Sequence, residues 1–437
     1  MALTSSPSGP LRGSFRVPGD KSITHRALLL GAWAEGETTV RGANAGADCA
    51  ALAKAVGALG AVVRAESEDS KERVLYRLRG TAGHWEEPLG PLDLGNSGTA
   101  FRLLAGSVAT ADVFAVLDGD RSLRRRPMGR IVEPLRRMGT RVDGAGQGTR
   151  APLAIRGGGL TGIRHASRVA SAQVKSAILL AGLGALGETW VEEPRPSRDH
   201  TERLLPWFGG RLLTDGARVG VAGPATLRGT EVEVPGDFSA AAFWIVAALI
   251  VPGSEIEITD VGLNPRRTGL LRVLERMGAD VQVTVVRETA GEPVGRVHAR
   301  ASSLRGATLG ADEVPDLIDE IPIWSVAAAS AEGASTLSGA EELRGKESDR
   351  LQGLAKGLAK LGVTVTERPD GLAIEGRGNG PLPGGGKLSS AADHRLAMSF
   401  LIAGLRARDG VEVSSGGMVD TSYPGFYSRL LALVSSR

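Results

Sequence analysis

Six short polar segments, each standing just before or within the first turn of an apolar run, carry the residue types best suited to chemistry. The runs behind them are too apolar for surface helices, so their first turns should end at a buried or cleft surface. A helix N-terminus offers unpaired N–H groups and a positive dipole end, and several facing one cleft would form an anion site. The segments are GDKSITHR (19–26), GNSGTAFR (95–102), SAQVKS (171–176), GDFS (236–239), PDLIDEIP (315–322) and ADHR (392–395).

The cations beside these helix ends favour a bound anion over simple capping. Capping accounts for the first polar residue of each segment, because Asp, Asn and Ser are common N-caps. It does not account for the basic residues, since the helix dipole disfavours a positive charge at this end. An anionic ligand between the cations would resolve the conflict. The N-cap candidates are Asp20, Asn96, Ser171, Asp237 and Asp393, and the cations are Lys21, Arg26, Arg102, Lys175 and Arg395.

Two further basic segments could contribute to such a site. GDRSLRRRPMGR (119–130) has no apolar periodicity, and a run of this kind is usually a solvated turn. Its member expected to face a ligand is Arg126, because Pro127 starts the next helix. KESDR (346–350) opens another helix and places Lys346 and Arg350 on one face of it.

The elements that position these residues follow an internal repeat. Residues 17–40 and 234–258 both begin V-P-G-D-x-S, continue through an apolar helix and enter a β-rich strand after Gly. A finer pattern of apolar helix, tight turn and strand recurs six times at intervals of about 75 residues. The sequence therefore predicts six α/β units, three in each half, with the second half opening near residue 234.

A doubly wound dinucleotide-binding sheet is the alternative α/β architecture. It would need a G-x-G-x-x-G segment between a strand and a helix, followed by an acidic residue. GAGQGT (144–149) is the Gly-rich candidate, but it precedes a short strand and opens no helix. We interpret it as a turn.

Composition argues against several classes of protein. A chain of 437 residues predicts two domains, and a net charge of +3, with 49 acidic residues against 52 basic ones, argues against a nucleic-acid-binding protein. No apolar run has membrane-spanning length, and we expect no secretory signal at the N-terminus. The single Cys49 allows no intrachain disulfide, which suits the cytoplasm. The six His residues lack metal-ligand spacing.

Eight segments together resemble the enolpyruvyl transferase family, and within it the branch that acts on shikimate 3-phosphate. They match that family's segments in the same order and span residues 18 to about 400. Each match is modest alone, but eight in order form a specific signal. The segments are PGDKSITHRALLL, LGNSGTAFR, RRRPMGRI, ASAQVKSA, PSRDHTE, VPDLIDE, LRGKESDR and DHRLAM.

The resemblance implies a two-domain inside-out α/β barrel with six βαβαββ-type units, three per domain. One domain would be discontinuous, with residues 1–20 and 237–437, and the other would be the insertion 21–236. The active site would lie in the cleft between them, with hinges near Asp20 and Pro235–Gly236. The resemblance also implies a cytoplasmic monomer that acts on small molecules without a metal or organic cofactor.

The implied reaction moves the enolpyruvyl group of phosphoenolpyruvate to the 5-hydroxyl of shikimate 3-phosphate and releases phosphate, on the pathway to chorismate and the aromatic amino acids. Asp316 would take the hydroxyl proton, and Glu347 with Lys21 would protonate the methylene carbon. Shikimate 3-phosphate would be bound by Lys21, Ser22, Arg26, Ser171, Gln173, Ser197, Asp316 and Lys346. Phosphoenolpyruvate would be bound by Lys21, Asn96, Gly98, Arg126, Gln173, Arg350 and Arg395. Glyphosate would occupy the phosphoenolpyruvate site.

Three positions depart from the family's pattern. Glu342 stands in a segment where members have Asn before Trp, His200 replaces a frequent Tyr, and Thr421 replaces a frequent Lys. These changes bear on substrate affinity more than on chemistry.

Two competing functions remain at this stage. The sister transferase that acts on UDP-N-acetylglucosamine typically has a Lys-Asn pair at the start and a Cys in a catalytic loop, whereas this chain has Lys21-Ser22 and only Cys49. A non-catalytic, Arg-rich nucleic-acid-binding protein would need a contiguous basic face, but the Arg residues are interleaved with acidic ones.

Overall fold

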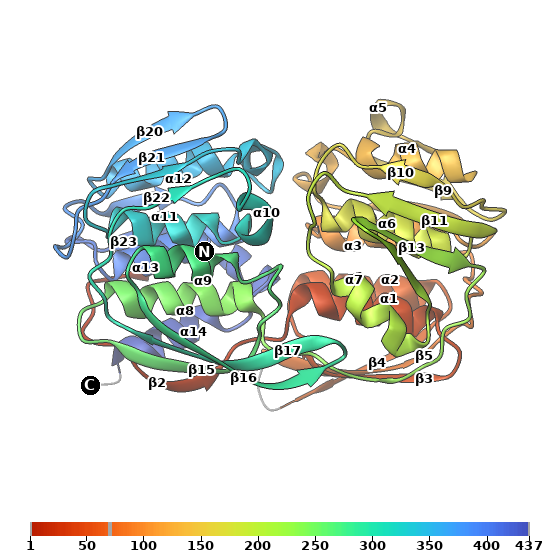
Figure 1. Ribbon diagram of the computed structural model, residues 1–437, viewed down its shortest axis with the longest axis horizontal. Helices are drawn as coiled ribbons and strands as arrows, with labels where there is room; N and C mark the ends of the chain where they lie inside the picture. Colours follow the sequence, from red (N-terminus) through yellow and green to blue (C-terminus); the bar gives the residue numbers. More distant parts are fainter. Residues whose placement is uncertain (1, 69–71, 436–437) are drawn as a thin grey trace. The chain divides into compact units, whose positions relative to one another are not determined.

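The computed structural model describes residues 2–68 and 72–435, and the chain divides into two compact units (Figure 1). Unit 1 comprises the N-terminal residues up to Pro18, Pro235–Arg287 and the chain from Pro293 onward. Unit 2 comprises Gly19–Val234 and the short segment Glu288–Glu292. Within the described residues, no helix is long and apolar enough to cross a membrane.

The βαβαββ repeat is seen most simply in the middle of unit 2. Its sheet has the strand order β6-β7-β9-β8, in which β6 is parallel to β7 and the other pairs are antiparallel. The helix between β6 and β7 provides the crossover that a parallel pair requires. The repeat consists of β6 (Leu92–Asp93), α3 (Gly98–Val108), β7 (Phe114–Asp118), α4 (Gly129–Met138), β8 (Arg141–Gly144) and β9 (Arg150–Arg156).

Two other repeats have the same connectivity and the same pattern of one parallel and two antiparallel pairs. In unit 2 the repeat is β10 (Arg164–Ala166), α6 (Ala172–Leu183), β11 (Gly187–Glu192), α7 (His200–Leu204), β12 (Leu212–Asp215) and β13 (Arg218–Gly223). In unit 1 it is β18 (Thr308–Leu309), α10 (Val314–Leu317), α11 (Ile321–Ala329), β19 (Ala334–Leu337), α12 (Arg350–Lys360), β20 (Thr364–Arg368) and β21 (Gly371–Glu375).

The first repeat of each half exchanges its first strand. β2 (Arg12–Arg16) precedes α1 (Lys21–Trp33), yet it pairs in parallel with β15 (Glu255–Gly262) in unit 1. β14 (Glu231–Glu233) precedes α8 (Phe238–Ile250), yet it pairs in parallel with β3 (Glu37–Asn44) in unit 2. The exchange explains why the chain passes from one unit to the other immediately after each of these strands.

The exchanged strands complete two further four-stranded sheets, of order β14-β3-β5-β4 and β16-β17-β15-β2. The sixth sheet, of order β1-β23-β22, has three strands. Over residues 2–68 and 72–435 each unit thus contains three sheets, and the prediction of six α/β units is confirmed. The remaining α-helices and strands are α2 (Ala47–Ala58), β4 (Val62–Ser67), β5 (Arg73–Arg79), α5 (Ala145–Gly148), α9 (Gly269–Arg276), β16 (Asp280–Thr289), β17 (Glu292–Arg300), β1 (Leu3–Ser5), β22 (Gly386–Ser389), α13 (His394–Gly404), β23 (Val411–Ser414) and α14 (Phe426–Ser435). The one-turn α5 lies in the segment interpreted as a turn, and its Gly146 and Gln147 have non-helical backbone angles.

Three apolar helices fill the core of each unit, with sheets outside them (Figure 1). In unit 1 every residue of α8, α11 and α13 is buried, as expected for helices that are apolar on all sides. In unit 2 the residues of α1, α3 and α6 that are not buried lie in or near the first turn. They are Lys21, Ser22, Thr99, Arg102, Ala172 and Gln173. In unit 2, therefore, the accessible parts of these core helices are their polar N-terminal turns.

Candidate active site

Gln173, at the start of α6, links the first turns of two core helices of unit 2. Its Nε2 donates to Thr99 Oγ1 at 2.8 Å, and its Oε1 accepts from Arg102 Nη1 at 2.7 Å. Arg102 also donates to the carbonyl oxygens of Gly98, at 3.3 Å, and Pro127, at 3.1 Å. These bonds show that α3 and α6 bring their N-termini together, as an anion site built from helix ends requires.

Three of the residues expected to bind phosphoenolpyruvate lie together at the start of α3. The buried Arg126 donates from Nη2 to Asn96 Oδ1 at 2.5 Å. Gly98 is the first residue of α3, and a Cβ added there would lie 2.7 Å from Arg126 Nη1 and 2.9 Å from Arg102 Nη1. The absence of a side chain at Gly98 therefore lets two guanidinium groups approach the helix end.

Lys21 and Arg26 on α1 are both held by protein partners. Lys21 Nζ lies 2.9 Å from Asp48 Oδ2. The buried Arg26 donates to Thr201 Oγ1 at 2.6 Å and to Ser176 Oγ at 2.7 Å. Burial lowers the pKa of Arg26 to about 10, and the charge of Arg198 acts in the same direction against nearby carboxylates. Arg26 thus remains a cation at neutral pH and also joins α1 to α6 and α7.

His25 is a fully buried neutral base between these two cations. Burial lowers its pKa to about 3, and the charges of Lys21 and Arg26 act in the same direction. Its unfolded-state pKa is ordinary, near 6.5. Below about pH 6.5, His25 becomes protonated in the unfolded chain but stays neutral in the folded protein. The free energy of unfolding therefore decreases as the pH falls, until the pH approaches 3 and the folded state is protonated as well.

Replacing His25 should therefore flatten the acid limb of the stability profile. We expect the unfolding free energy of His25→Gln to depend less steeply on pH than that of wild type between pH 6 and 4, by about 1.4 kcal/mol per pH unit. Urea unfolding at several pH values measures this slope. His84→Gln, which replaces an exposed histidine, is the control. If the unfolding free energies of wild type and His25→Gln changed in parallel with pH, a low pKa for His25 in the folded protein would be contradicted.

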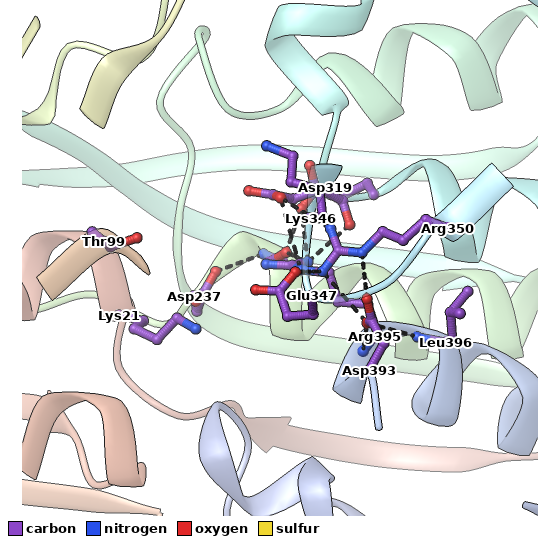
Figure 2. A network of polar contacts seen from close by, with 12 residues as sticks. Lys21, Thr99, Asp237, Asp319, Lys346, Glu347, Arg350, Asp393, Arg395 and Leu396 are labelled. Carbon is purple, nitrogen blue, oxygen red and sulfur yellow. Dashed lines mark hydrogen bonds and ion pairs between the residues drawn. The ribbon is translucent and has the colours of Figure 1, made fainter. Parts of the chain in front are cut away.

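In unit 1 a buried network joins the starts of α12 and α13, and Figure 2 shows its residues converging. Arg350 donates to Asp393 Oδ2 at 2.8 Å and to Glu347 Oε2 at 2.6 Å. Asp393 caps α13 by accepting from the backbone N–H groups of Arg395, at 2.9 Å, and Leu396, at 3.3 Å. Burial opposes the charged form of Arg350, but Asp393, Glu347 and Asp319 raise its pKa above the usual value.

A second ion cluster in unit 1 holds Arg395 in place. Arg267 Nη1 lies 3.0 Å from Glu320 Oε1, and its Nη2 lies 3.5 Å from Asp237 Oδ1. Ser239 donates to Glu320 and accepts from Arg395, while Arg395 also donates to the Asp319 carbonyl at 2.9 Å. The first turns of α8, α11 and α13 are thereby tied together through buried charges.

Of the two aspartates in VPDLIDE, Asp319 takes part in the ion pairs around Arg350 and Arg395, whereas Asp316 pairs with another arginine. Asp316 Oδ2 accepts from Arg272 Nη2 at 2.5 Å, and Arg272 is half exposed. The carboxylate of Asp319 lies 3.6 Å from Arg350 Nη1 and 3.9 Å from Arg395 Nε. Asp316 lies within the short α10, whereas Asp319 follows it in the turn before α11, and of the two only Asp319 pairs with Arg350 and Arg395 among the described residues.

A signal for Asp319 was present in the sequence. Asp20, Asp237 and Asp393 each stand just before a core helix, and Asp319 has nearly the same place before α11. The resemblance had instead assigned the base to Asp316, the first Asp of VPDLIDE.

The three departures from the family's pattern have definite partners. Glu342 Oε1 accepts from Lys346 Nζ at 3.0 Å. His200 Nδ1 lies 2.7 Å from Glu292 Oε1, and both side chains are buried. Thr421 Oγ1 donates to the Met418 carbonyl at 2.7 Å. Among the residues that the structure describes, no three His, Cys, Asp or Glu side chains are grouped so that they could hold a metal ion.

The fold is that of the enolpyruvyl transferases, since the structure aligns with the enolpyruvyl transferase NikO from Streptomyces tendae. The TM-score is 0.78 with 18% identity, over 99% of this chain and 97% of that one. The match to EPSP synthase from Acinetobacter baumannii has a TM-score of 0.85 with 42% identity, over 99% and 97% of the two chains.

Sequence comparison defines the family more narrowly. Residues 5–430 match the family described as EPSP synthase (3-phosphoshikimate 1-carboxyvinyltransferase). Relatives with the name 3-phosphoshikimate 1-carboxyvinyltransferase include those of Synechococcus sp. (strain JA-3-3Ab), 51% identical over 99% of this chain and 97% of the relative, and of Thermus thermophilus, 50% identical over 100% and 99%. The chain belongs to the EPSP synthase family, which confirms the resemblance seen in its motifs.

Proposed function

We propose that this protein transfers the enolpyruvyl group of phosphoenolpyruvate to the 5-hydroxyl of shikimate 3-phosphate and releases phosphate. The observation that carries the proposal is the match of residues 5–430 to a family described by this reaction, with relatives about half identical over the whole chain. The cation-lined helix ends of both units suit two polyanionic substrates. Phosphate release that requires both substrates tests the proposal.

In the proposed mechanism, two carboxylates of unit 1 move protons. Asp319, beside Arg350 and Arg395, takes the proton from the attacking 5-hydroxyl. Glu347, with Lys21, protonates the methylene carbon of phosphoenolpyruvate, and its carboxylate stabilises the positive charge that develops at the adjacent carbon. The hydroxyl oxygen adds to that carbon to form a tetrahedral intermediate. Glu347 then takes back a methyl proton while Asp319 gives its proton to the departing phosphate, which restores the double bond and both carboxylates.

The binding roles follow the resemblance, with Asp319 in place of Asp316. Shikimate 3-phosphate is bound by Lys21, Ser22, Arg26, Ser171, Gln173, Ser197, Asp319 and Lys346. Phosphoenolpyruvate is bound by Lys21, Asn96, Gly98, Arg126, Gln173, Arg350 and Arg395. Arg26 contributes mainly its charge, because its Nε and Nη2 already donate to Thr201 and Ser176.

Neither unit holds a complete set of these residues, so we infer that the units close on the substrates. Lys21, Arg126 and Gln173 belong to unit 2, whereas Asp319 and Arg350 belong to unit 1. The chain connections at Pro18–Gly19 and Val234–Pro235 are the natural hinges. We further infer a cytoplasmic monomer that acts on small molecules and not on nucleic acid.

Closure predicts a measurable compaction. Saturating shikimate 3-phosphate should lower the radius of gyration in small-angle X-ray scattering, because a ligand bound by residues of both units draws the units together. Calorimetry on the same sample establishes that the ligand is bound. An unchanged radius of gyration with bound ligand would contradict closure.

Gly98→Ala tests the clearance at the start of α3. The new methyl would displace the ends of Arg126 and Arg102, so we expect the KM for phosphoenolpyruvate to rise about tenfold. Glyphosate, which is longer, should be weakened more. The melting temperature should change little, because Gly98 is helical and Ala is the better helix former by about 1 kcal/mol.

Gly129→Ala is the matched control for this variant. Gly129 also begins a helix of unit 2, but a Cβ there would meet its nearest neighbour, Thr149, at an ordinary 3.7 Å. Its substrate KM and glyphosate inhibition should equal those of wild type. Equal inhibition of wild type and Gly98→Ala would mean that Gly98 does not line the site.

A further inference from the structure

A buried carboxylate, Glu193, joins two segments of unit 2 that each supply a serine for the proposed acceptor site. Its Oε1 accepts from the backbone N–H of Ser171 at 2.8 Å and from Ser197 Oγ at 2.7 Å. Its Oε2 accepts from the backbone N–H of Ser197 at 3.2 Å. Ser171 is the N-cap residue of α6, and Ser197 lies in the loop between β11 and α7 (Figure 1).

Lys175 also holds Glu193 in place. Its Nζ lies 2.9 Å from Glu193 Oε2 and 2.7 Å from Glu202 Oε1, and it donates to the Ser197 carbonyl at 3.4 Å. The side chains of Lys175, Glu193 and Glu202 are 4%, 6% and 8% exposed. A buried ammonium between two carboxylates fixes the geometry of Glu193 more tightly than a solvated pair would.

The arrangement has a consequence for both serine hydroxyls. Ser171 occupies the N-cap position in an extended conformation (φ −147°, ψ 103°), its side chain makes no capping hydrogen bond to α6, and Glu193 accepts from its backbone N–H. Ser197 donates its hydroxyl hydrogen to Glu193, which turns the oxygen lone pairs away from the carboxylate. Glu193 accepts only, so it imposes this orientation on each partner.

We propose that Glu193 is a positioning residue for the acceptor site, which holds Ser171 and Ser197 in register so that both serines act on one shikimate 3-phosphate molecule. This inference rests on the proposed function. Glu193 itself need not touch the ligand, and a carboxylate facing a phosphate would repel it. Its effect should therefore be on acceptor affinity and much less on the binding of phosphoenolpyruvate.

Glu193→Gln tests this role, since the amide keeps the shape but presents an N–H₂ group to at least one donor. We expect the Kd for shikimate 3-phosphate, measured by calorimetry, to rise about tenfold to a hundredfold, as misplacement of ligand-binding groups does. The KM for phosphoenolpyruvate should change less than about threefold. Binding of shikimate 3-phosphate by the wild-type protein is measured first, because it tests the proposed function by itself. If the wild-type protein did not bind this ligand, the proposed function would be rejected, and the result would not bear on Glu193.

Glu202→Gln is the matched control. It removes the same charge from the same buried lysine, and the structure gives Glu202 contact with Lys175 and none with Ser171 or Ser197 among the described residues. If Glu193 positions the serines, the Kd for shikimate 3-phosphate should rise several times more in Glu193→Gln than in Glu202→Gln, although the two variants lose similar amounts of melting temperature. Equal rises, or an unchanged Kd for Glu193→Gln, would overturn the inference.

A double-mutant cycle keeps the inference testable if Glu193→Gln folds poorly. Glu193→Asp retains the charge, but its shorter side chain moves the carboxylate away from the serines. The Kd is measured for this variant, for Ser197→Ala and for the double variant. If Glu193 acts through Ser197, Glu193→Asp should raise the Kd less in the Ser197→Ala background than in wild type. Equal factors in both backgrounds would show that Glu193 acts independently of Ser197.

Discussion

Asp319→Asn should fold normally and bind both substrates but turn over about a hundredfold to ten-thousandfold more slowly, the range usual for a general acid or base. The amide retains the shape of the carboxylate and cannot accept the hydroxyl proton. Because the substitution removes a negative charge from between Arg350 and Arg395, the KM for phosphoenolpyruvate should not rise. Steady-state kinetics with both substrates measures the two effects separately.

Asp316→Asn is the control for this prediction. It is also a neutral replacement within VPDLIDE, but its carboxylate pairs with the half-exposed Arg272. We expect its turnover to lie within about threefold of wild type, since exposed ion pairs contribute little. Slow turnover of Asp316→Asn together with normal turnover of Asp319→Asn would return the base to Asp316.

Arg350→Met should destabilise unit 1 by about 3–5 kcal/mol even without substrates, because it leaves a buried carboxylate without its cation. Asp393 is 0% exposed, and Arg350 is the guanidinium that donates to it at 2.8 Å. Methionine fills much of the same space, so the loss reports the uncompensated charge and not a cavity. Urea unfolding of the ligand-free protein measures the loss in the transition assigned to unit 1.

Arg272→Met separates this effect from a general cost of removing arginine. Arg272 also pairs with an aspartate of unit 1, but its side chain is 48% exposed. The expected change is below about 1 kcal/mol. Similar losses in the two variants would contradict the account of Arg350 as the counter-charge of a buried carboxylate.

The sequence was sufficient to predict the six-fold repeat and its division into halves, because apolar helices and tight turns leave a strong periodic pattern. Local patterns could not predict the exchange of first strands, which entered only through the resemblance, because the domains it implies place residues 1–20 with 237–437. β2 and β14 stand at equivalent positions before V-P-G-D, and nothing in their composition says that each pairs with the sheet of the other half. Strand partners are decided by long-range packing, which local sequence does not record.

The candidate site was predicted unevenly, for a similar reason. Motifs located Arg126, Asn96 and Gly98, which the structure brings together at one helix end. They led to Asp316, and the proposal of Asp319 instead depends on ion-pair distances that only the folded chain gives. Glu193 carries no motif of its own, and its contacts with Ser171 and Ser197 are visible only in the folded chain.

The most direct test of the proposed function is acceptor-dependent phosphate release from phosphoenolpyruvate, with the new product identified by NMR. The same protein sample is assayed with shikimate 3-phosphate, with UDP-N-acetylglucosamine and with no acceptor. We predict that phosphate is released, with an equal amount of enolpyruvyl product, only in the sample that contains phosphoenolpyruvate and shikimate 3-phosphate. Phosphate release with UDP-N-acetylglucosamine and not with shikimate 3-phosphate would contradict the proposed function. Phosphate release at the same rate with and without an acceptor would contradict it as well.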